Sequence, residues 1–275
     1  MGLNTLQKIL LGYLVFLVIF WIALHASGQT ESIYNSLYSL AFSLTPLIAG
    51  AVGMVQSRIW GGLRSHVGKA VFFIALGIFV WGAGSMVWSY YNIVLQVEMP
   101  YPSLADLGFA PSIFFYGLGA IYLSKATGAK FGLRNKFAKL FVTIAPLVIL
   151  LFSYYVLVVV ARGGVLLPDG ETPLKTFFDL AYPLGDFVGL TVSIIVSGLS
   201  FRYLGGVYLA DIIAILLGLA VMFVADSVFS YTTTVGTFYN GDWGDLLLTF
   251  GLFLLAFGTL GFSKLRTFNA ARAPK

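Results

Sequence analysis

Eight long apolar stretches, separated by short polar connections, dominate this sequence of 275 residues. Each stretch is close to the roughly 17–25 apolar residues that a helix needs to cross the hydrocarbon core of a bilayer. A soluble domain would have to expose this surface to water, because 59% of the residues are hydrophobic and only 10% are charged. The pattern predicts an all-α polytopic membrane protein with a single membrane domain over residues 1–275. We expect its spans at about residues 9–26, 36–56, 70–92, 105–123, 140–161, 179–200, 206–231 and 244–262.

Basic residues are distributed unevenly between the connections on the two sides of the expected bundle. Of the 16 Lys and Arg residues, only Arg162 and Lys175 fall on one side. Cytoplasmic connections of membrane proteins carry an excess of Lys and Arg. The distribution therefore predicts that the N-terminus and the C-terminus are both cytoplasmic. It also explains the net charge of +5 as a topology signal, so nucleic acid is not an expected partner.

The sequence restricts the chemistry that the protein can carry. It has no cysteine, which excludes disulfides and thiolate metal sites. Its two histidines, His25 and His66, lie at or beyond expected helix ends, which argues against a bis-histidine haem site within the membrane. We therefore expect no cofactor, whereas a metal bound through oxygen ligands stays open.

A short internal repeat connects the two halves of the chain. Three expected spans open with similar phrases: Ala-Asp-Leu-Gly-Phe (105–109), Phe-Asp-Leu-Ala-Tyr (178–182) and Gly-Asp-Leu-Leu (244–247). In addition, Val-Trp-Ser-Tyr (87–90) matches Val-Phe-Ser-Tyr (228–231), 141 residues later. Because the expected helices that carry the second pair point the same way, the sequence predicts two parallel four-helix repeats.

Five aspartates near one face of the membrane are candidates for a binding site. Asp106, Asp179 and Asp245 stand at expected helix starts, where a structural alternative exists: a carboxylate there caps free N–H groups and is worth about 0.3–1 kcal/mol. Asp186 and Asp226 fall inside spans, and no Lys or Arg lies in any span at that depth. Acids in such positions usually face the bundle interior or a wet cavity and are functional by default.

Three states reconcile the two intramembrane acids with their surroundings. They are protonated, or hydroxyl and indole donors solvate them, or they bind a cation or an amine. Tyr182 lies on the same helix face as Asp186, and Trp88 and Tyr231 lie at a similar depth. An aromatic belt or a structural hydrogen-bond network would account for the same residues. Acids beside aromatic rings would equally suit a small cationic or amphiphilic ligand. The candidate ligand-binding residues are Asp106, Asp179, Tyr182, Asp186, Asp226, Tyr231, Asp245 and Trp88.

Three signatures resemble a known family. The first is Trp-Gly-x-Gly (81–84) with Trp-Ser-Tyr-Tyr (88–91) and Pro-Tyr-Pro-Ser-Leu-Ala-Asp (100–106). The second is Asp-Leu-Ala-Tyr-Pro-Leu-x-Asp (179–186), and the third runs from Ala225-Asp226 through Tyr231, Gly236 and Tyr239 to Trp243 and Asp245. Together they resemble the multi-span bacterial membrane module found N-terminal to GGDEF and EAL cyclic-di-GMP enzymes and to some histidine kinases.

The resemblance implies a sensor module in a prokaryotic plasma membrane that passes a signal to a cytoplasmic output domain. Only about a dozen residues follow the last expected span, so we expect a separate signalling partner in the cytoplasm or the membrane.

The function expected from the sequence is a non-catalytic membrane sensor or ligand-binding module. The alternative is a proton- or cation-coupled transporter or channel, although Asp211 is the one acid in the inner halves of the spans. An enzyme is not expected, because the sequence has no H-E-x-x-H, no Ser/His pairing at membrane depth and no Gly-rich phosphate loop. A structural assembly factor that uses the basic loop 125–139 also stays open, although topology and anionic lipids account for that loop.

Overall fold

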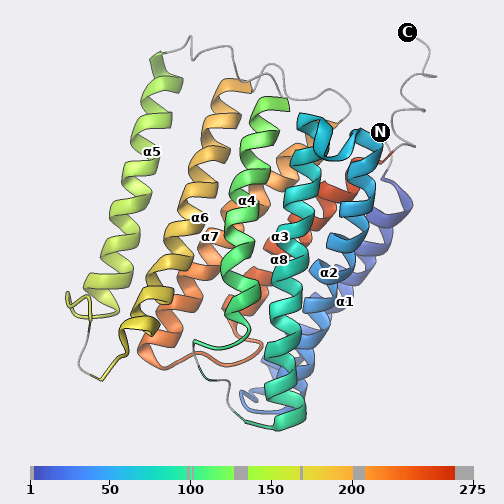
Figure 1. Ribbon diagram of the computed structural model, residues 1–275. Coiled ribbons are helices and arrows are strands. Elements are labelled where there is room, and N and C mark those ends of the chain that lie inside the picture. Colours follow the sequence, from blue (N-terminus) through green and yellow to red (C-terminus); the bar gives the residue numbers. More distant parts are fainter. Residues whose placement is uncertain are drawn as a thin grey trace.

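A computed structural model describes residues 3–97, 100, 102–126, 136–167, 170–200 and 208–263, with side chains left out at 136–139, 141–142 and 192–200. All regular structure in these ranges is helical (Figure 1). The long helices are α1 (Thr5–Ser27), α2 (Ile33–Ser57), α3 (His66–Ser89), α4 (Asp106–Ala126), α5 (Lys136–Tyr154), α6 (Pro173–Ser200), α7 (Leu209–Val235) and α8 (Trp243–Gly261). The predicted all-α polytopic fold is confirmed.

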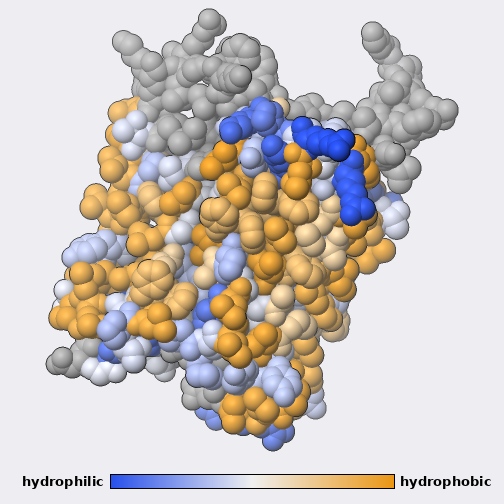
Figure 2. All heavy atoms as spheres, in the orientation of Figure 1, coloured by the Kyte–Doolittle hydropathy of each residue, from blue (hydrophilic) through white to orange (hydrophobic). Residues whose placement is uncertain are grey.

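The helices have the dimensions and the surface of membrane spans. Within the described residues, seven helices are long and apolar enough to cross a membrane, and α6 adds a further helix of 28 residues. Apolar residues cover the flank of the bundle, while strongly hydrophilic residues gather at the end near the α2–α3 connection (Figure 2). This distribution is what a bilayer requires, because the hydrocarbon contacts the flank and water contacts the ends.

Six helices form a closed ring, and two lie outside it. Around the ring α2 packs on α3, α3 on α4, α4 on α6, α6 on α7, α7 on α8, and α8 on α2. Outside the ring, α1 packs against α2 and α8, and α5 packs against α6. The order within α1–α4 is repeated in α5–α8, and the two halves meet where α4 contacts α6 and where α1, α2 and α3 contact α8.

Close packing within each half depends on small residues. A Cβ atom added to Gly108 on α4 would lie 2.6 Å from the backbone nitrogen of Gly84 on α3. In membranes, where the hydrophobic effect does not drive helices together, such close backbone approach supplies the van der Waals contact that holds them.

The start of α1 and the end of α8 lie at the same end of the bundle. Asn4 caps α1, and its Nδ2 donates a hydrogen bond to the carbonyl of Leu260 at 2.8 Å. Eight long helices in up-and-down order produce this arrangement. The cytoplasmic orientation of that end stays a prediction. Most of the basic loop 125–139 and the basic tail after residue 263 lie outside the described residues.

The start of α6 differs from the expected span. The helix begins at Pro173 and not at Asp179. Proline is favoured in the first helical turn because its φ is fixed at a helical value. Asp179 therefore lies in the second turn of α6 and does not cap it. By contrast, α4 begins at Asp106 and α8 begins at Trp243, close to the expected starts. The C-terminal ends of α3 and α5 continue as π-helical segments, η3 (Tyr90–Leu95) and η4 (Tyr155–Val160).

Candidate functional site

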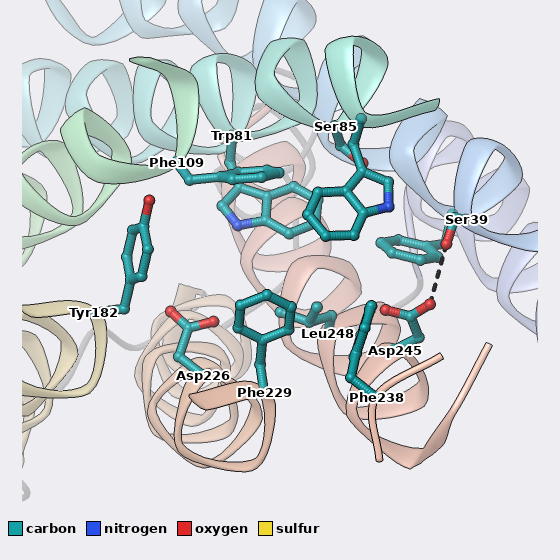
Figure 3. A pocket seen from close by; sticks show the side chains of 12 residues that line it. Ser39, Trp81, Ser85, Phe109, Tyr182, Asp226, Phe229, Phe238, Asp245 and Leu248 are labelled. Carbon is teal, nitrogen blue, oxygen red and sulfur yellow. Dashed lines mark hydrogen bonds between the residues drawn. The ribbon is translucent and has the colours of Figure 1, made fainter. Parts of the chain in front are cut away.

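A cavity lies inside the ring of six helices, where the two halves of the chain meet (Figure 3). About 60 Å³ of it is open to the centres of water molecules, which is room for several waters or a small ligand. Helices α2, α3, α4, α6, α7 and α8 and the α7–α8 connection all contribute to its wall. The lining residues are Ser39, Phe42, Trp81, Ser85, Trp88, Phe109, Tyr182, Asp226, Phe229, Phe238, Asp245 and Leu248.

Aromatic rings make up most of the wall. Seven of the twelve lining side chains are aromatic. Trp81 contacts Phe109 with ring centroids 5.1 Å apart. Trp88, Phe229 and Phe238 form a second group, with centroids 5.1 to 6.2 Å apart and edge-to-face geometry. Aromatic faces carry negative electrostatic potential, so a wall of this kind attracts a cation that has lost part of its hydration shell.

Two carboxyl groups face the cavity from opposite sides, Asp226 on α7 and Asp245 on α8, with Phe229 between them in Figure 3. Asp245 Oδ2 accepts hydrogen bonds from the backbone N–H of Gly241 at 2.6 Å and from Ser39 Oγ at 3.0 Å. None of the twelve lining residues is basic. Among the described residues, His, Cys, Asp and Glu do not form a group of three that could hold a metal. The cavity is therefore acidic and aromatic, and it lacks a dense ligand shell for a divalent ion.

A second carboxyl group lies directly behind Asp226. The carboxyl groups of Asp186 and Asp226 lie within hydrogen-bonding reach of each other, and a hydrogen bond between them needs a proton on one of the two, because a carboxylate has no donor. Asp186 is buried, and its Oδ2 has no hydrogen-bond partner. The buried hydroxyl of Tyr116 also has no partner with good geometry, and it lies within electrostatic range of both acids. Asp186 and Tyr116 therefore form, outside the lining of the cavity, a small buried cluster of polar groups whose hydrogen bonds are incompletely satisfied.

The two halves of the chain exchange hydrogen bonds across the cavity. Tyr182 on α6 donates to Asp106 on α4, and Ser39 on α2 donates to Asp245 on α8. Ser39 and Tyr182 are 143 positions apart, while Asp106 and Asp245 are 139 apart and open matching phrases. Each half thus donates one hydrogen bond, from Ser39 or Tyr182 at equivalent positions, to the equivalent aspartate of the other half.

The same equivalence relates two buried polar pairs. Ser43 on α2 and Ser85 on α3 form a hydrogen bond in the first half. Asp186 is 143 positions after Ser43, and Asp226 is 141 positions after Ser85. The second half therefore carries a carboxyl pair where the first half carries a hydroxyl pair. Both carboxyl groups that line the cavity, Asp226 and Asp245, also belong to the second half.

Asp179 belongs to a separate ion-pair cluster near the N-terminal end of α6. Its Oδ2 lies 2.5 Å from Arg162 Nη2 and 2.9 Å from Lys175 Nζ, and the side chains of Asp179 and Arg162 are fully buried. Glu171 joins the cluster through Lys175 at 3.0 Å and Thr176 Oγ1 at 2.9 Å. Burial works to raise the pKa of Glu171, but hydrogen bonds from Lys175 and Thr176 and the charges of Lys175 and Arg162 outweigh it, so its pKa is lowered. Two cations pair with Oδ2 of Asp179, while its buried Oδ1 has no hydrogen-bond partner.

The structure separates the predicted site residues into three groups. Asp226, Asp245, Tyr182 and Trp88 line the cavity. Asp186 and Asp106 lie behind this wall, hydrogen-bonded to Asp226 and Tyr182 respectively. Asp179 and Tyr231 are not among the lining residues.

Several lining residues carried no clear signal in the sequence. They are the four phenylalanines, the two serines and Leu248. The repeat held one usable signal, because Trp88 matches Phe229 across the halves. A further contributor outside the wall is Asn240, whose Oδ1 accepts a hydrogen bond from Trp88 Nε1 at 2.9 Å.

Comparison of the chain with family models, curated proteins and solved structures finds no match.

Proposed function

We propose that this protein is a non-catalytic membrane module that binds a small organic cation in the cavity between its two halves and signals through a separate partner. The observation that carries the proposal is the composition of the wall. Seven aromatic side chains and two carboxyl groups surround the space, and none of the lining residues is basic. An alkylated ammonium group suits such a site, because it is cationic, weakly hydrated and attracted to aromatic faces.

A sensing role fits the position of the cavity at the junction of the halves. A ligand that contacts both halves stabilises whichever arrangement of them it binds better, and its effect equals its differential affinity for the two arrangements. The cross-half hydrogen bonds of Tyr182 and Ser39 lie in the same wall. Binding would therefore act directly on the contacts that set how the halves meet, and a partner at the bundle ends would receive the change.

A proton- or cation-coupled transporter is the second candidate, and the neighbouring carboxyl groups of Asp186 and Asp226 favour it. Transport needs a polar route to the other end of the bundle. Asp211, the acid at that end, is fully buried and accepts a hydrogen bond from Gln7 Nε2 at 2.9 Å. This acid is built into helix packing, which supports binding over transport.

Thermal unfolding of the purified protein in detergent tests the proposal. Tetramethylammonium and choline would be added over a concentration series, with Na⁺, Mg²⁺ and a chelator as comparisons. A ligand that binds only the folded state adds about 2.7 kcal/mol of stability at one hundred times its dissociation constant. We expect stabilisation by the quaternary ammonium ions and its loss in Asp226→Asn and Asp245→Asn.

Glu31→Gln is the matched control, because Glu31 is exposed and its replacement removes the same charge away from the cavity. Stabilisation that survives both cavity variants would place binding elsewhere and reject the site. Uptake of the labelled cation into liposomes that contain the protein would instead establish the transporter.

A further inference from the structure

A second hollow lies on the flank of the bundle, between α4 and α6. It has a volume of about 420 Å³, larger than the inner cavity on the same measure. Its lining is apolar except for one hydroxyl. Residues from α4 are Ala110, Ile113, Phe114, Gly117, Leu118 and Ile121, and residues from α6 are Phe177, Phe178, Ala181, Tyr182, Gly185 and Val188. We call this hollow the flank groove.

The flank groove opens toward the hydrocarbon of the membrane. Phe114, Phe177 and Val188, which line it, are each more than half exposed. Phe114 belongs to α4, which is long and apolar enough to span a bilayer, and Phe177 and Val188 belong to α6, a helix of 28 residues. In a bilayer this groove contacts acyl chains and not water.

Tyr182 joins the flank groove to the inner cavity. Its side chain lines both spaces, and its ring stacks on Phe178 at 5.6 Å. Its hydroxyl is held by Asp106 on α4, so the ring stands between the apolar groove and the acidic cavity, both of which it lines. A molecule that occupied both spaces would have to be apolar on one side of this ring and cationic on the other.

We infer that the ligand is a cationic amphiphile, with its ammonium head in the inner cavity and its alkyl tail in the flank groove. The inference rests on the proposed function, because the head occupies the site proposed there. Two features select this occupant. The charge of the head complements Asp226 and Asp245, and the groove that meets the cavity at Tyr182 is apolar along its whole length. The ligand would enter from the membrane between α4 and α6, past Tyr182.

Gly117 offers a way to block the groove without disturbing the fold. It lines the groove, and a Cβ atom added there would have no other atom within 4 Å. A leucine at this position therefore fills space that the tail would use. Gly12 on α1 is the matched control, because a Cβ atom there would also meet nothing within 4 Å and α1 lies outside the ring.

The experiment measures binding of tetramethylammonium and octyltrimethylammonium to the full chain in nanodiscs of zwitterionic lipid. Comparing variants in identical nanodiscs cancels the partitioning of the longer ion into lipid. We expect Gly117→Leu to lower the affinity for octyltrimethylammonium about tenfold, because the leucine side chain overlaps the space of the alkyl tail. The affinity for tetramethylammonium should stay unchanged. Gly12→Leu should change neither. If Gly117→Leu fails to fold, Phe177→Ala removes part of the groove wall from an exposed position and should show the same selectivity.

The outcomes separate the two proposals. Selective loss of the long-chain ion supports the flank groove as the tail site. If Gly117→Leu binds both ions as tightly as the wild type, or loses affinity for both ions equally, the flank groove is not the tail site. The head site stands in either case. If neither ion binds the wild type, the proposed function fails, and the tail site fails with it.

Discussion

Tyr182 on α6 donates a hydrogen bond to the carboxylate of Asp106 on α4, so the second half of the chain holds the start of a helix in the first. Asp106 Oδ2 also accepts a hydrogen bond from the backbone N–H of Ser103 at 2.6 Å. One carboxylate thus fixes both the turn before its own helix and the junction of the halves. Asp106 does not accept its backbone hydrogen bond from a free N–H of the first helical turn, as helix capping would require, but from Ser103 before the helix.

Replacing Tyr182 with Phe removes the donor and leaves a buried carboxylate with fewer hydrogen bonds. We expect a loss of about 1–3 kcal/mol in the free energy of unfolding, the usual cost of leaving a buried polar group without its partner. Unfolding in detergent with increasing denaturant measures this. Tyr34→Phe serves as the control, because Tyr34 is 58% exposed. An equal effect of the two variants would mean that the Tyr182 hydroxyl contributes nothing specific.

The carboxyl pair predicts different outcomes for two replacements of Asp186. In Asp186→Asn the amide N–H donates to Asp226, as a proton shared by the two carboxyl groups would. The free energy of unfolding should therefore stay within about 1 kcal/mol of the wild type. Asp186→Ala leaves Asp226 without this partner and opens a cavity, which should cost about 1–3 kcal/mol more. Thermal unfolding of both variants decides the matter. Equal losses would show that the two carboxyl groups are not paired through a proton.

The sequence was sufficient for the class of fold but not for the composition of the site. Hydropathy depends on local composition, so it located the helices that the structure confirms. The site depends on contacts between distant elements, such as Ser39 with Asp245, which no local pattern encodes. Asp179 illustrates the limit. Because α6 begins at Pro173, Asp179 lies one turn deeper than a helix start, where Arg162 reaches it.

Asp242, the N-cap of α8, should respond in opposite directions to two replacements. Its Oδ1 accepts a hydrogen bond from the backbone N–H of Asp245 at 3.0 Å. Burial raises the pKa of Asp242 above its ordinary value of 3.8, and hydrogen bonds from the N–H groups of Asp245 and Gly244 offset only part of this effect. The folded state therefore disfavours the ionised form. We expect Asp242→Asn, which keeps the cap without the charge, to be at least as stable as the wild type at pH 7.

One set of unfolding measurements checks both the direction of the pH dependence and the contribution of the N-cap to stability. The wild type should lose stability relative to Asp242→Asn as the pH rises from below 3.8 through the raised pKa of Asp242. Asp242→Ala loses the cap and should be about 1 kcal/mol less stable than Asp242→Asn at every pH. Unfolding measured from pH 3.5 to 8 gives both comparisons, and a stability difference between wild type and Asn that does not depend on pH would contradict the effect of burial.

From the ion-pair cluster near the N-terminal end of α6 we expect a contribution to stability that is lost in acid. The folded-state pKa of Glu171 is lower than its ordinary value of 4.5, so its ion pairs stabilise the protein above pH 4.5 and are lost as the pH falls through the lowered value. Glu171→Gln should remove this part of the acid dependence. Arg162→Met should cost about 3–5 kcal/mol, because it leaves Asp179 buried with one partner fewer. Lys175→Met should cost less, since the Lys175 side chain is 22% exposed.

Replacement by alanine should have opposite effects on stability at two glycines of α4. Gly108 lies against α3, where an added Cβ atom would be 2.6 Å from the nitrogen of Gly84, whereas Gly117 faces open space. In a helix interior alanine is favoured over glycine by about 1 kcal/mol. Gly117→Ala should therefore be neutral or stabilising. Gly108→Ala should destabilise by about 1–3 kcal/mol, because α3 and α4 must separate to admit the methyl group. Thermal unfolding of the two variants tests the packing of the first half directly, and a stable Gly108→Ala variant would mean that α3 and α4 do not approach as closely as this structure requires.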